Sequence, residues 1–338
     1  MRLNPIRIAT ALVLLCGMAG GVQAQSAADY PNKPIRLLIP FGPGGLTDIA
    51  ARLLSEPVRE ILGQPVIVES KPGGSGVVAF QDLIRSKPDG HTMVIGVNTT
   101  NLLNPIIRAH EMPFDVRKVL IPVTGLVEAP QVFLATKVDF PPGNVKEFIE
   151  YARAHPGKLN HAVIGSGSNS HFDFLLMQKK YRFNIVTVPA RSGAASAQVD
   201  LINGAIHVAM MNAATYTPLV KGGRLKALAV TGDKRTAELP DVPTLKEQGF
   251  SDFGVGTWSG LFVAAGTPKE IVNKIHHAFT TALASEKIRE QFPKFTITSF
   301  AHRSPEEFAK WLDAEFESWS RTADEFREEL GMPPKKTN

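Results

Sequence analysis

The stretch 35-IRLLIPFGPGGLTDIAARLLSEPVREILG-63 determines the fold class of this chain. It begins with a short apolar run at 35–39, passes through a glycine-rich turn and continues with apolar residues spaced along one helical face. This order predicts a buried strand, a tight turn and an amphipathic helix, with Gly63 placed to end the helix. Pro57 lies inside the predicted helix, so either the helix bends there or its predicted boundaries are wrong.

Similar units recur along the chain, because short runs rich in Val, Ile and Leu alternate with helical patterns. The further predicted strands are 66–68, 92–97, 131–135, 159–164, 185–188, 205–211, 225–231 and 260–264. Each run is followed by Gly, Pro or Asn, which predicts an α/β protein with a largely parallel sheet. Residues 306–327 form a last amphipathic helix, for which packing on its own domain is favoured over docking to a partner.

The first 24 residues have the pattern of a secretory signal peptide. Arg2 and Arg7 precede an apolar run at 8–15, and small residues around Ala24 suit cleavage there. The pattern predicts a protein exported to the periplasm. Because the chain's one cysteine, Cys16, belongs to this leader, we expect neither disulfides nor a cysteine nucleophile in the mature protein.

The composition of the remaining chain excludes several classes of function. The full chain carries a net charge of +5, and without the two leader arginines 35 basic residues face 32 acidic ones. This balance argues against nucleic-acid binding, which uses basic residues clustered on one face. About 310 residues suit two domains. No spacing of His, Asp or Glu resembles a zinc or calcium site, so we predict no metal and no cofactor.

The turn at 41–48 is suited to holding an anion. Its glycines let the backbone approach a ligand, and the following helix presents free N–H groups with a partial positive charge. The turn lacks the lysine of a phosphate-binding P-loop, and its glycines do not match the dinucleotide fingerprint G-x-G-x-x-G. The alternative is an ordinary strand-to-helix connection.

A second turn of this kind, at 165–171, follows the predicted strand 159–164 and precedes another helix. Together, the two turns could clamp one anion from opposite sides. Asn98 and Thr99 follow the strand 92–97, where ligands of open α/β sheets gather. A serine hydrolase using Ser166, Ser168 or Ser170 with His171 is the competing interpretation, but the turn lacks the second glycine of G-x-S-x-G.

Taken together, these segments resemble the Bug-type periplasmic solute-binding proteins, the receptors of tripartite tricarboxylate transporters. The resemblance runs from Tyr30 nearly to the C-terminus. Its most specific pieces are Tyr30-Pro31, Lys33-Pro34-Ile35-Arg36, Pro43-Gly44-Gly45, Thr47-Asp48, 62-LGQPV-66, 87-KPDG-90, 156-PGKLN-160, 225-LKALAVT-231, 239-LPDVPT-244 and 266-GTP-268.

The resemblance implies a Venus flytrap fold, in which two lobes close by a hinge on a ligand in the cleft between them. Residues 25–127 and 254–338 would form lobe 1, and residues 128–253 lobe 2. The protein would be a monomeric receptor without enzymatic activity that passes a small carboxylate to membrane subunits. The expected ligand-binding residues are Phe41, Gly42, Gly44, Gly45, Thr47, Asp48, Asn98, Thr99, Ser166, Gly167, Ser168, Asn169, His171, Ala190, Arg191, Ser192, Met211 and Asn212.

Two departures from the family pattern bear on the ligand. The family often has Pro-Tyr-Lys-Gly after the strand that here ends at Pro189, whereas this chain continues with Ala190-Arg191-Ser192-Gly193. The aromatic residue is lost, and the forked cation of Arg191 could pair with a second carboxylate. Met211 replaces a common aspartate, which disfavours an amino-acid ligand and leaves a soft apolar wall. An aromatic dicarboxylate such as phthalate or terephthalate is therefore the leading prediction. Arg191 could equally be a solvated residue at a helix start, and Met210 or Met211 could be core.

Three functions remain open from the sequence. The first is the carboxylate receptor, which accounts for the leader, the two turns and the modest charge. The second is the secreted hydrolase, which would need a third group to orient His171 and an oxyanion hole. The third is a receptor that presents its ligand to a membrane kinase.

Overall fold

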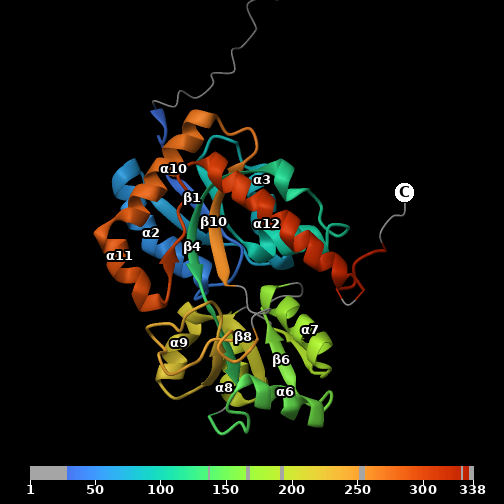
Figure 1. Cartoon of the computed structure of the whole chain (residues 1–338). Coiled ribbons are helices and arrows are strands. Elements are labelled where there is room, and N and C mark those ends of the chain that lie inside the picture. The colour runs from blue at the N-terminus through green and yellow to red at the C-terminus, as the bar shows by residue number, and fades with distance from the viewer. Residues whose placement is uncertain are drawn as a thin grey trace, which may run out of the picture.

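The chain folds into two α/β lobes stacked end to end and joined by extended segments (Figure 1). The computed structural model describes residues 29–135, 138–164, 168–190, 194–250, 256–328 and 330–334. The predicted signal peptide lies outside these residues. None of the described helices combines the length and the apolar content that a bilayer crossing requires.

Each lobe is built on one sheet. The sheet of the first lobe has the strand order β11-β4-β10-β3-β1-β2, and that of the second has the order β7-β6-β8-β5-β9. The strands are β1 (Ile35–Ile39), β2 (Val66–Ser70), β3 (Thr92–Val97), β4 (Leu120–Ala129), β5 (Gln131–Ala135), β6 (Asn160–Val163), β7 (Val186–Pro189), β8 (Val208–Asn212), β9 (Lys226–Val230), β10 (Thr257–Ala264) and β11 (Thr298–Ser299).

The sheets are mixed, so the prediction of a largely parallel sheet is wrong. Strands β1, β2 and β3 pair in parallel, as do β6, β7 and β8. The pairings of β4, β5 and β10 with their neighbours are antiparallel. The reason is the path of the chain. β4 leaves the first sheet and continues after one residue as β5 of the second, and β10 runs back beside β4.

Helices cover both faces of each sheet. In the first lobe, one face of the sheet is covered by α2, α10 and α11 and the other by α3 and α12. In the second lobe, one face is covered by α8 and α9 and the other by α6 and α7. The helices are α2 (Leu46–Leu62), α3 (Val77–Arg85), α4 (Asn104–Ile107), α5 (Val116–Val119), α6 (Val145–Ala154), α7 (Asn169–Tyr181), α8 (Ala194–Asn203), α9 (Ala213–Lys221), α10 (Lys269–Ala284), α11 (Glu286–Gln291) and α12 (Pro305–Glu325), with short turns η2 (Gly74–Gly76), η3 (Thr99–Leu103) and η4 (Phe292–Phe295).

Helix α2 follows the predicted boundaries and continues through Pro57. Gly63 ends it in the left-handed conformation with φ of 72°, and its N–H donates to the carbonyl of Arg59 at 2.8 Å. This confirms Gly63 as the residue that stops the helix, because a left-handed backbone costs glycine no Cβ clash.

Helix α12 packs on its own lobe and also reaches the second one. Near its start, Phe308 is fully buried in the first lobe. Toward its end, the ring of Trp319 meets that of Phe172 on α7 at a centroid distance of 5.4 Å, and Lys179 Nζ lies 4.8 Å from the ring centroid of Phe326. In Figure 1 the helix accordingly runs diagonally from the first lobe toward α7. Its apolar face is therefore used within the chain.

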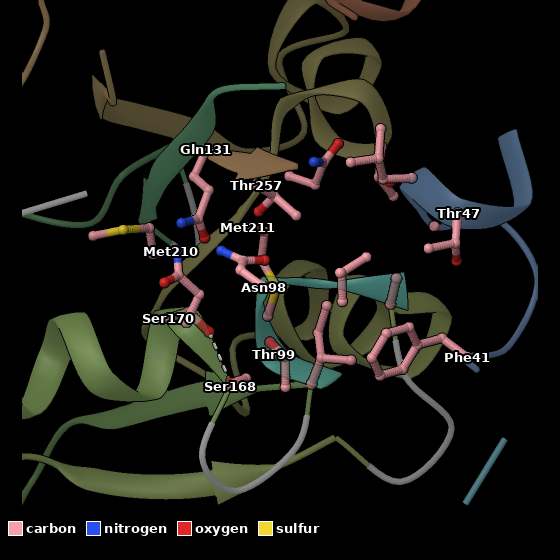
Figure 2. Close-up of a pocket in the computed structure, with 18 of the residues that line it drawn as sticks. Phe41, Thr47, Asn98, Thr99, Gln131, Ser168, Ser170, Met210, Met211 and Thr257 are labelled. Carbon is pink, nitrogen blue, oxygen red and sulfur yellow. Dashed lines mark hydrogen bonds between the residues drawn. The ribbon is translucent and has the colours of Figure 1, made fainter. Parts of the chain in front are cut away.

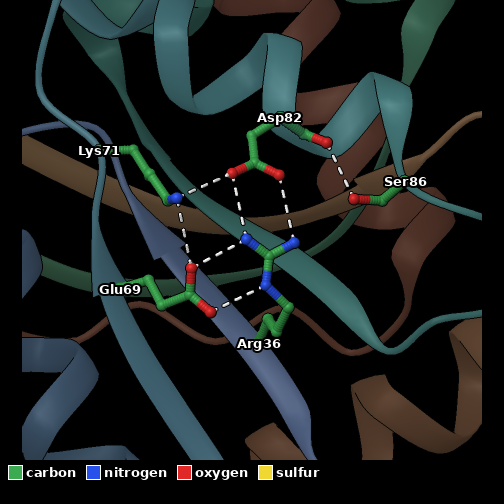
Figure 3. Close-up of polar contacts among 5 residues, drawn as sticks. All are labelled: Arg36, Glu69, Lys71, Asp82 and Ser86. Atoms are coloured by element: carbon green, nitrogen blue, oxygen red, sulfur yellow. Dashed lines mark hydrogen bonds and ion pairs between the residues drawn. The ribbon is translucent and has the colours of Figure 1, made fainter.

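A four-residue ion-pair network ties β1, β2 and α3 together (Figure 3). Arg36 on β1 holds Glu69 through a 2.8 Å contact and Asp82 on α3 through a 3.1 Å contact. Lys71 Nζ lies 3.2 Å from Asp82 Oδ2. These side chains are partly exposed, so the network contributes modestly to stability, but its bidentate arginine contacts fix geometry. It flanks the connection from β2 to α3, which carries Ser75.

The division into lobes at residues 127 and 254 remains a prediction. The first predicted boundary falls inside β4, and the second lies within 251–255, outside the described residues. The described strands of the first sheet come from 35–129 and 257–299, and those of the second from 131–230.

Candidate functional site

A pocket of about 820 Å³, counting the space at its mouth, lies where the two lobes meet (Figure 2). It is formed at the carboxyl ends of the parallel strands β1, β3, β6 and β8, the edge at which open α/β sheets bind ligands. Its lining residues are Phe41, Gly42, Gly45, Leu46, Thr47, Ser75, Val97, Asn98, Thr99, Gln131, Ile164, Ser168, Asn169, Ser170, Ala194, Met210, Met211, Asn212, Thr215, Tyr216 and Thr257.

The turn after β1 presents the N-terminus of α2 to this pocket. Gly44 has φ of 84°, a conformation that strains other residues. Asp48 folds back on the turn: its carboxylate accepts from the N–H of Gly44 at 3.0 Å and from Arg52 Nε at 2.8 Å. Gly45 is the N-cap, and no side chain among the described residues caps the helix there. The first N–H groups of α2 are thus left for a ligand.

The end of β3 contributes a polar side chain from the same lobe. Asn98 immediately follows the strand and precedes the π-helical turn η3, a rare conformation that is frequent at functional sites. Its side chain is 1% exposed, and within the described chain neither its Oδ1 nor its Nδ2 has a hydrogen-bond partner. The pocket therefore contains an amide whose bonding capacity is unused.

The second lobe adds two further helix N-termini. Ser168 caps α7, with its Oγ accepting from the N–H of His171 at 3.4 Å, and it lies 3.3 Å from Ser170 Oγ. Asn212 caps α9: its Oδ1 accepts from the N–H of Ala214 at 2.9 Å, while its buried Nδ2 has no partner among the described residues. Hydroxyl and amide groups of the second lobe thus face the α2 turn of the first.

A direct hydrogen bond joins the lobes beside the pocket. Thr215 Oγ1, in the first turn of α9, donates to the carbonyl of Gly44 at 3.0 Å. The structure therefore has the two lobes in contact, with the pocket between their helix ends.

The apolar part of the wall comes from β8 and α9. Met210 and Met211 are each 1% exposed, and in Figure 2 the side chain of Met210 points away from the labelled polar groups. Met210 belongs to the core around Phe133, whereas Met211 packs with Tyr216. The phenol of Tyr216 donates to the carbonyl of Ala194 at 3.0 Å. Both methionines are therefore core residues that also form the pocket wall.

Electrostatically, the site is unusual in carrying no ionised side chain among its described lining residues. The N-termini of α2, α7 and α9 each supply a partial positive charge equivalent to about half an elementary charge, and the carboxylate of Asp48 at the start of α2 is paired with Arg52. Oriented N–H, amide and hydroxyl donors, with no acidic side chain among the described lining residues, suit a carboxylate or similar anion.

The structure places most of the predicted site residues in the pocket. Those that line it are Phe41, Gly42, Gly45, Thr47, Asn98, Thr99, Ser168, Asn169, Met211 and Asn212, whereas Gly44, Asp48, His171 and Ala190 are not lining residues. Ser166, Gly167, Arg191 and Ser192 lie outside the described residues. Whether any of these residues binds a ligand remains a prediction.

Eleven lining residues were not among the predicted site residues, and the two that lie farthest from any predicted turn are Gln131 and Thr257. They begin strands β5 and β10, the segments that connect the lobes. Neither follows a glycine-rich turn, so no local sequence signal marks them. Only Pro130 separates β4 from β5, so a prediction of both strands would have placed Gln131 at the junction of the lobes.

The described lining of the site contains no set of catalytic residues of the kind that a serine hydrolase would need. No described lining residue is an acid or a histidine, and no three His, Cys, Asp or Glu side chains of the described chain gather as a metal site would require. Ser168 Oγ is used as a helix cap.

His161 on β6 is fully buried and is not among the residues that line the pocket. Its ring stacks on Phe174 at a centroid distance of 3.6 Å, and neither ring nitrogen has a partner in the described part of the chain. Burial, aided by nearby His171, holds the pKa of His161 well below its usual value. Burial likewise lowers the pKa of His171.

These shifts predict acid sensitivity with a definite sign. Because the folded-state pKa of His161 is depressed, the unfolded chain takes up the proton first, and the free energy of unfolding falls as pH drops through about 6.5. Denaturant titrations should show His161→Leu losing up to about 2 kcal/mol less than wild type between pH 7.5 and 5.0. The control His277→Leu removes an exposed histidine and should keep the wild-type loss. An equal loss in His161→Leu would refute the assignment.

The chain is similar to proteins of one receptor family. A sequence model described as "Tripartite tricarboxylate transporter family receptor" matches residues 50–326. A UPF0065 protein of Bordetella pertussis is 34% identical over 276 residues, covering 82% of this chain and 83% of that protein.

Solved structures of the same kind match over most of the chain. MatC from Rhodopseudomonas palustris, solved with bound malate, has a TM-score of 0.80 at 31% identity and covers 86% of this chain and 99% of its own. Rpa4515 from R. palustris, solved with adipate, has a TM-score of 0.83 at 28% identity, with coverage of 90% and 100%.

Proposed function

The chain belongs to the receptor family of tripartite tricarboxylate transporters, and on this basis we propose that it captures a small organic carboxylate in the periplasm for delivery to membrane subunits. The observation that carries the proposal is the convergence of the α2, α7 and α9 N-termini on one pocket whose described lining has no ionised side chain. The predicted signal peptide supports the periplasmic location.

We infer further that the ligand is a dicarboxylate. The helix ends lie on two walls, α2 in the first lobe and α7 with α9 in the second, so each wall can hold one carboxylate. The malate and adipate of the two R. palustris structures are dicarboxylates, which supports the same class here. Arg191 is proposed as an additional partner of the second carboxylate.

An aromatic spacer between the carboxylates is the favoured form. Met211, Tyr216 and Phe41 line the pocket, and thioether and aromatic groups pack well against a flat ring. Phthalate and terephthalate are therefore the leading candidates. Comparing their affinity with that of aliphatic dicarboxylates of similar length tests the preference for an aromatic spacer.

Delivery to membrane subunits requires that loaded and empty receptor differ in shape. The Thr215–Gly44 hydrogen bond links the lobes beside the pocket, so a ligand held by both walls would favour this joined arrangement. A sensor kinase could read the same difference, and only the membrane partner would distinguish the two outputs.

The test is a thermal-shift screen of residues 25–338 against mono-, di- and tricarboxylates, aromatic and aliphatic, with amino acids as negative probes. At a ligand concentration of about 100 times Kd, binding adds about 2.7 kcal/mol to stability. A shift with a dicarboxylate is expected, larger for phthalate or terephthalate than for adipate. The absence of a shift with every carboxylate would refute the receptor proposal, and a larger shift with adipate would refute the aromatic preference.

A further inference from the structure

The side chain of Asn98 has two unused hydrogen-bonding atoms of opposite kind. It is 1% exposed and lines the pocket, and both Oδ1 and Nδ2 lack a partner within the part of the chain that the structure describes. In either orientation of the amide, one acceptor and one donor are unpaired within the described part of the chain.

Three hydroxyl groups that lie close to Asn98 in the chain or line the same pocket, those of Thr100, Thr215 and Tyr216, already have partners, whereas Asn212 Nδ2 in the pocket lining is, like the Asn98 amide, unpaired among the described residues. Thr100 Oγ1 donates to Asn101 Oδ1 at 2.7 Å and accepts from the N–H of Val97 at 2.9 Å. The Thr215 hydroxyl donates to Gly44, and the Tyr216 phenol donates to Ala194. Because an unpaired buried amide is costly, its presence at a pocket wall indicates that a ligand completes it.

The two side-chain atoms of Asn98 require different groups on the ligand. Asn98 Nδ2 is a donor, like the N–H groups at the helix ends, and a carboxylate oxygen can satisfy it. Asn98 Oδ1 is an acceptor, and an ionised carboxylate has no proton to offer it. A ligand built only of carboxylates and hydrocarbon would leave this acceptor unpaired.

We propose that the ligand carries a hydroxyl group as well as its carboxylate, and that Asn98 is the residue that selects for it. The hydroxyl donates to Oδ1, and Nδ2 donates to an oxygen of the ligand. This inference rests on the proposed carboxylate receptor function and narrows its ligand to hydroxycarboxylates, aromatic or aliphatic. It assigns Asn98 the role of a specificity residue.

The test compares ligands that differ by one hydroxyl group. Calorimetric Kd values are measured for 4-hydroxyphthalate against phthalate, malate against succinate, and citrate against tricarballylate. In at least one pair the hydroxylated probe should bind about 10-fold or more tightly, because the analogue without the hydroxyl leaves the buried acceptor unpaired. Equal or weaker binding of the hydroxylated member in all three pairs would overturn the proposal.

The variant Asn98→Leu separates ligand selection from a structural role. Its backbone has φ of −49° and ψ of −42°, ordinary helical values that leucine adopts without strain. The variant should reduce the preference for the hydroxylated probe to within about 2-fold and should unfold, without ligand, at the same or a higher temperature than wild type. A structural asparagine would give the reverse: a lower melting temperature and an unchanged preference.

The control Asn184→Leu makes the same chemical change at an exposed position and should keep the wild-type preference. The outcomes also distinguish this inference from the proposed function. If carboxylates bind but the hydroxylated member binds no more tightly in any of the three pairs, the carboxylate receptor proposal stands and the hydroxyl selection is refuted. If none of the six probes binds, both the receptor proposal and the hydroxyl selection are refuted.

Discussion

Replacing Ser168 by aspartate is expected to weaken carboxylate binding by about 100-fold or more while leaving α7 folded. Ser168 is 8% exposed, lines the pocket and caps α7. Aspartate caps helices as well as serine does, and its charge suits a helix N-terminus. The fold is therefore preserved, but a fixed negative charge now occupies the region that the ligand carboxylate would enter, without a described cation in the lining to offset it.

The matched variant Ser168→Asn keeps a capping side chain without adding charge. Calorimetric titration should place its Kd within about 10-fold of wild type, since one hydrogen-bonding group has been exchanged for another. A comparable loss of affinity in the two variants would mean that the shape of the side chain at position 168, not its charge, determines ligand binding. Unimpaired binding by Ser168→Asp would show that the anion is bound elsewhere.

The largest expected loss of stability follows from Phe308→Ala. Phe308 on α12 is fully buried, with its ring centroid 5.6 Å from that of Phe262 on β10 and 6.2 Å from that of Trp258. Truncating a fully buried phenylalanine removes its transfer free energy and leaves a cavity, at a cost of about 3–5 kcal/mol. The substitution also loosens α12 from the sheet whose strands connect the lobes.

Phe316→Ala on the same helix is the control. Phe316 is only half-buried, with the guanidinium carbon of Arg117 4.2 Å from its ring centroid, so its loss should cost less than half as much. Denaturant unfolding of the two variants measures the difference. Similar costs at both positions would mean that α12 is not anchored through Phe308.

The sequence predicts the elements of this fold better than their pairing. The runs 35–39, 92–97 and 131–135 coincide with strands β1, β3 and β5, because each is a buried apolar run bounded by turn residues. Strand β4 was missed, since Pro122 and Gly125 interrupt its pattern. That omission also concealed the antiparallel pairing of β4 with β10.

The candidate site was predictable wherever it rests on local chemistry. Glycines before α2, a serine cap before α7 and Asn98 after β3 are all recognisable from neighbouring residues. Gln131 and Thr257 were not, because their position in the pocket follows from how two distant strands cross between the lobes. That Asn98 lacks a partner also depends on tertiary packing, which decides where the nearby hydroxyl groups donate.

The most direct test of the site is a calorimetric titration that compares one ligand with its uncharged form. The carboxylate with the largest thermal shift would be titrated beside its primary amide, which has nearly the same shape and no charge. Helix N-termini that bind an anion predict about 100-fold or greater weakening for the amide. Binding of the amide within about 3-fold of the acid would contradict the claim that the N-termini of α2, α7 and α9 select a carboxylate.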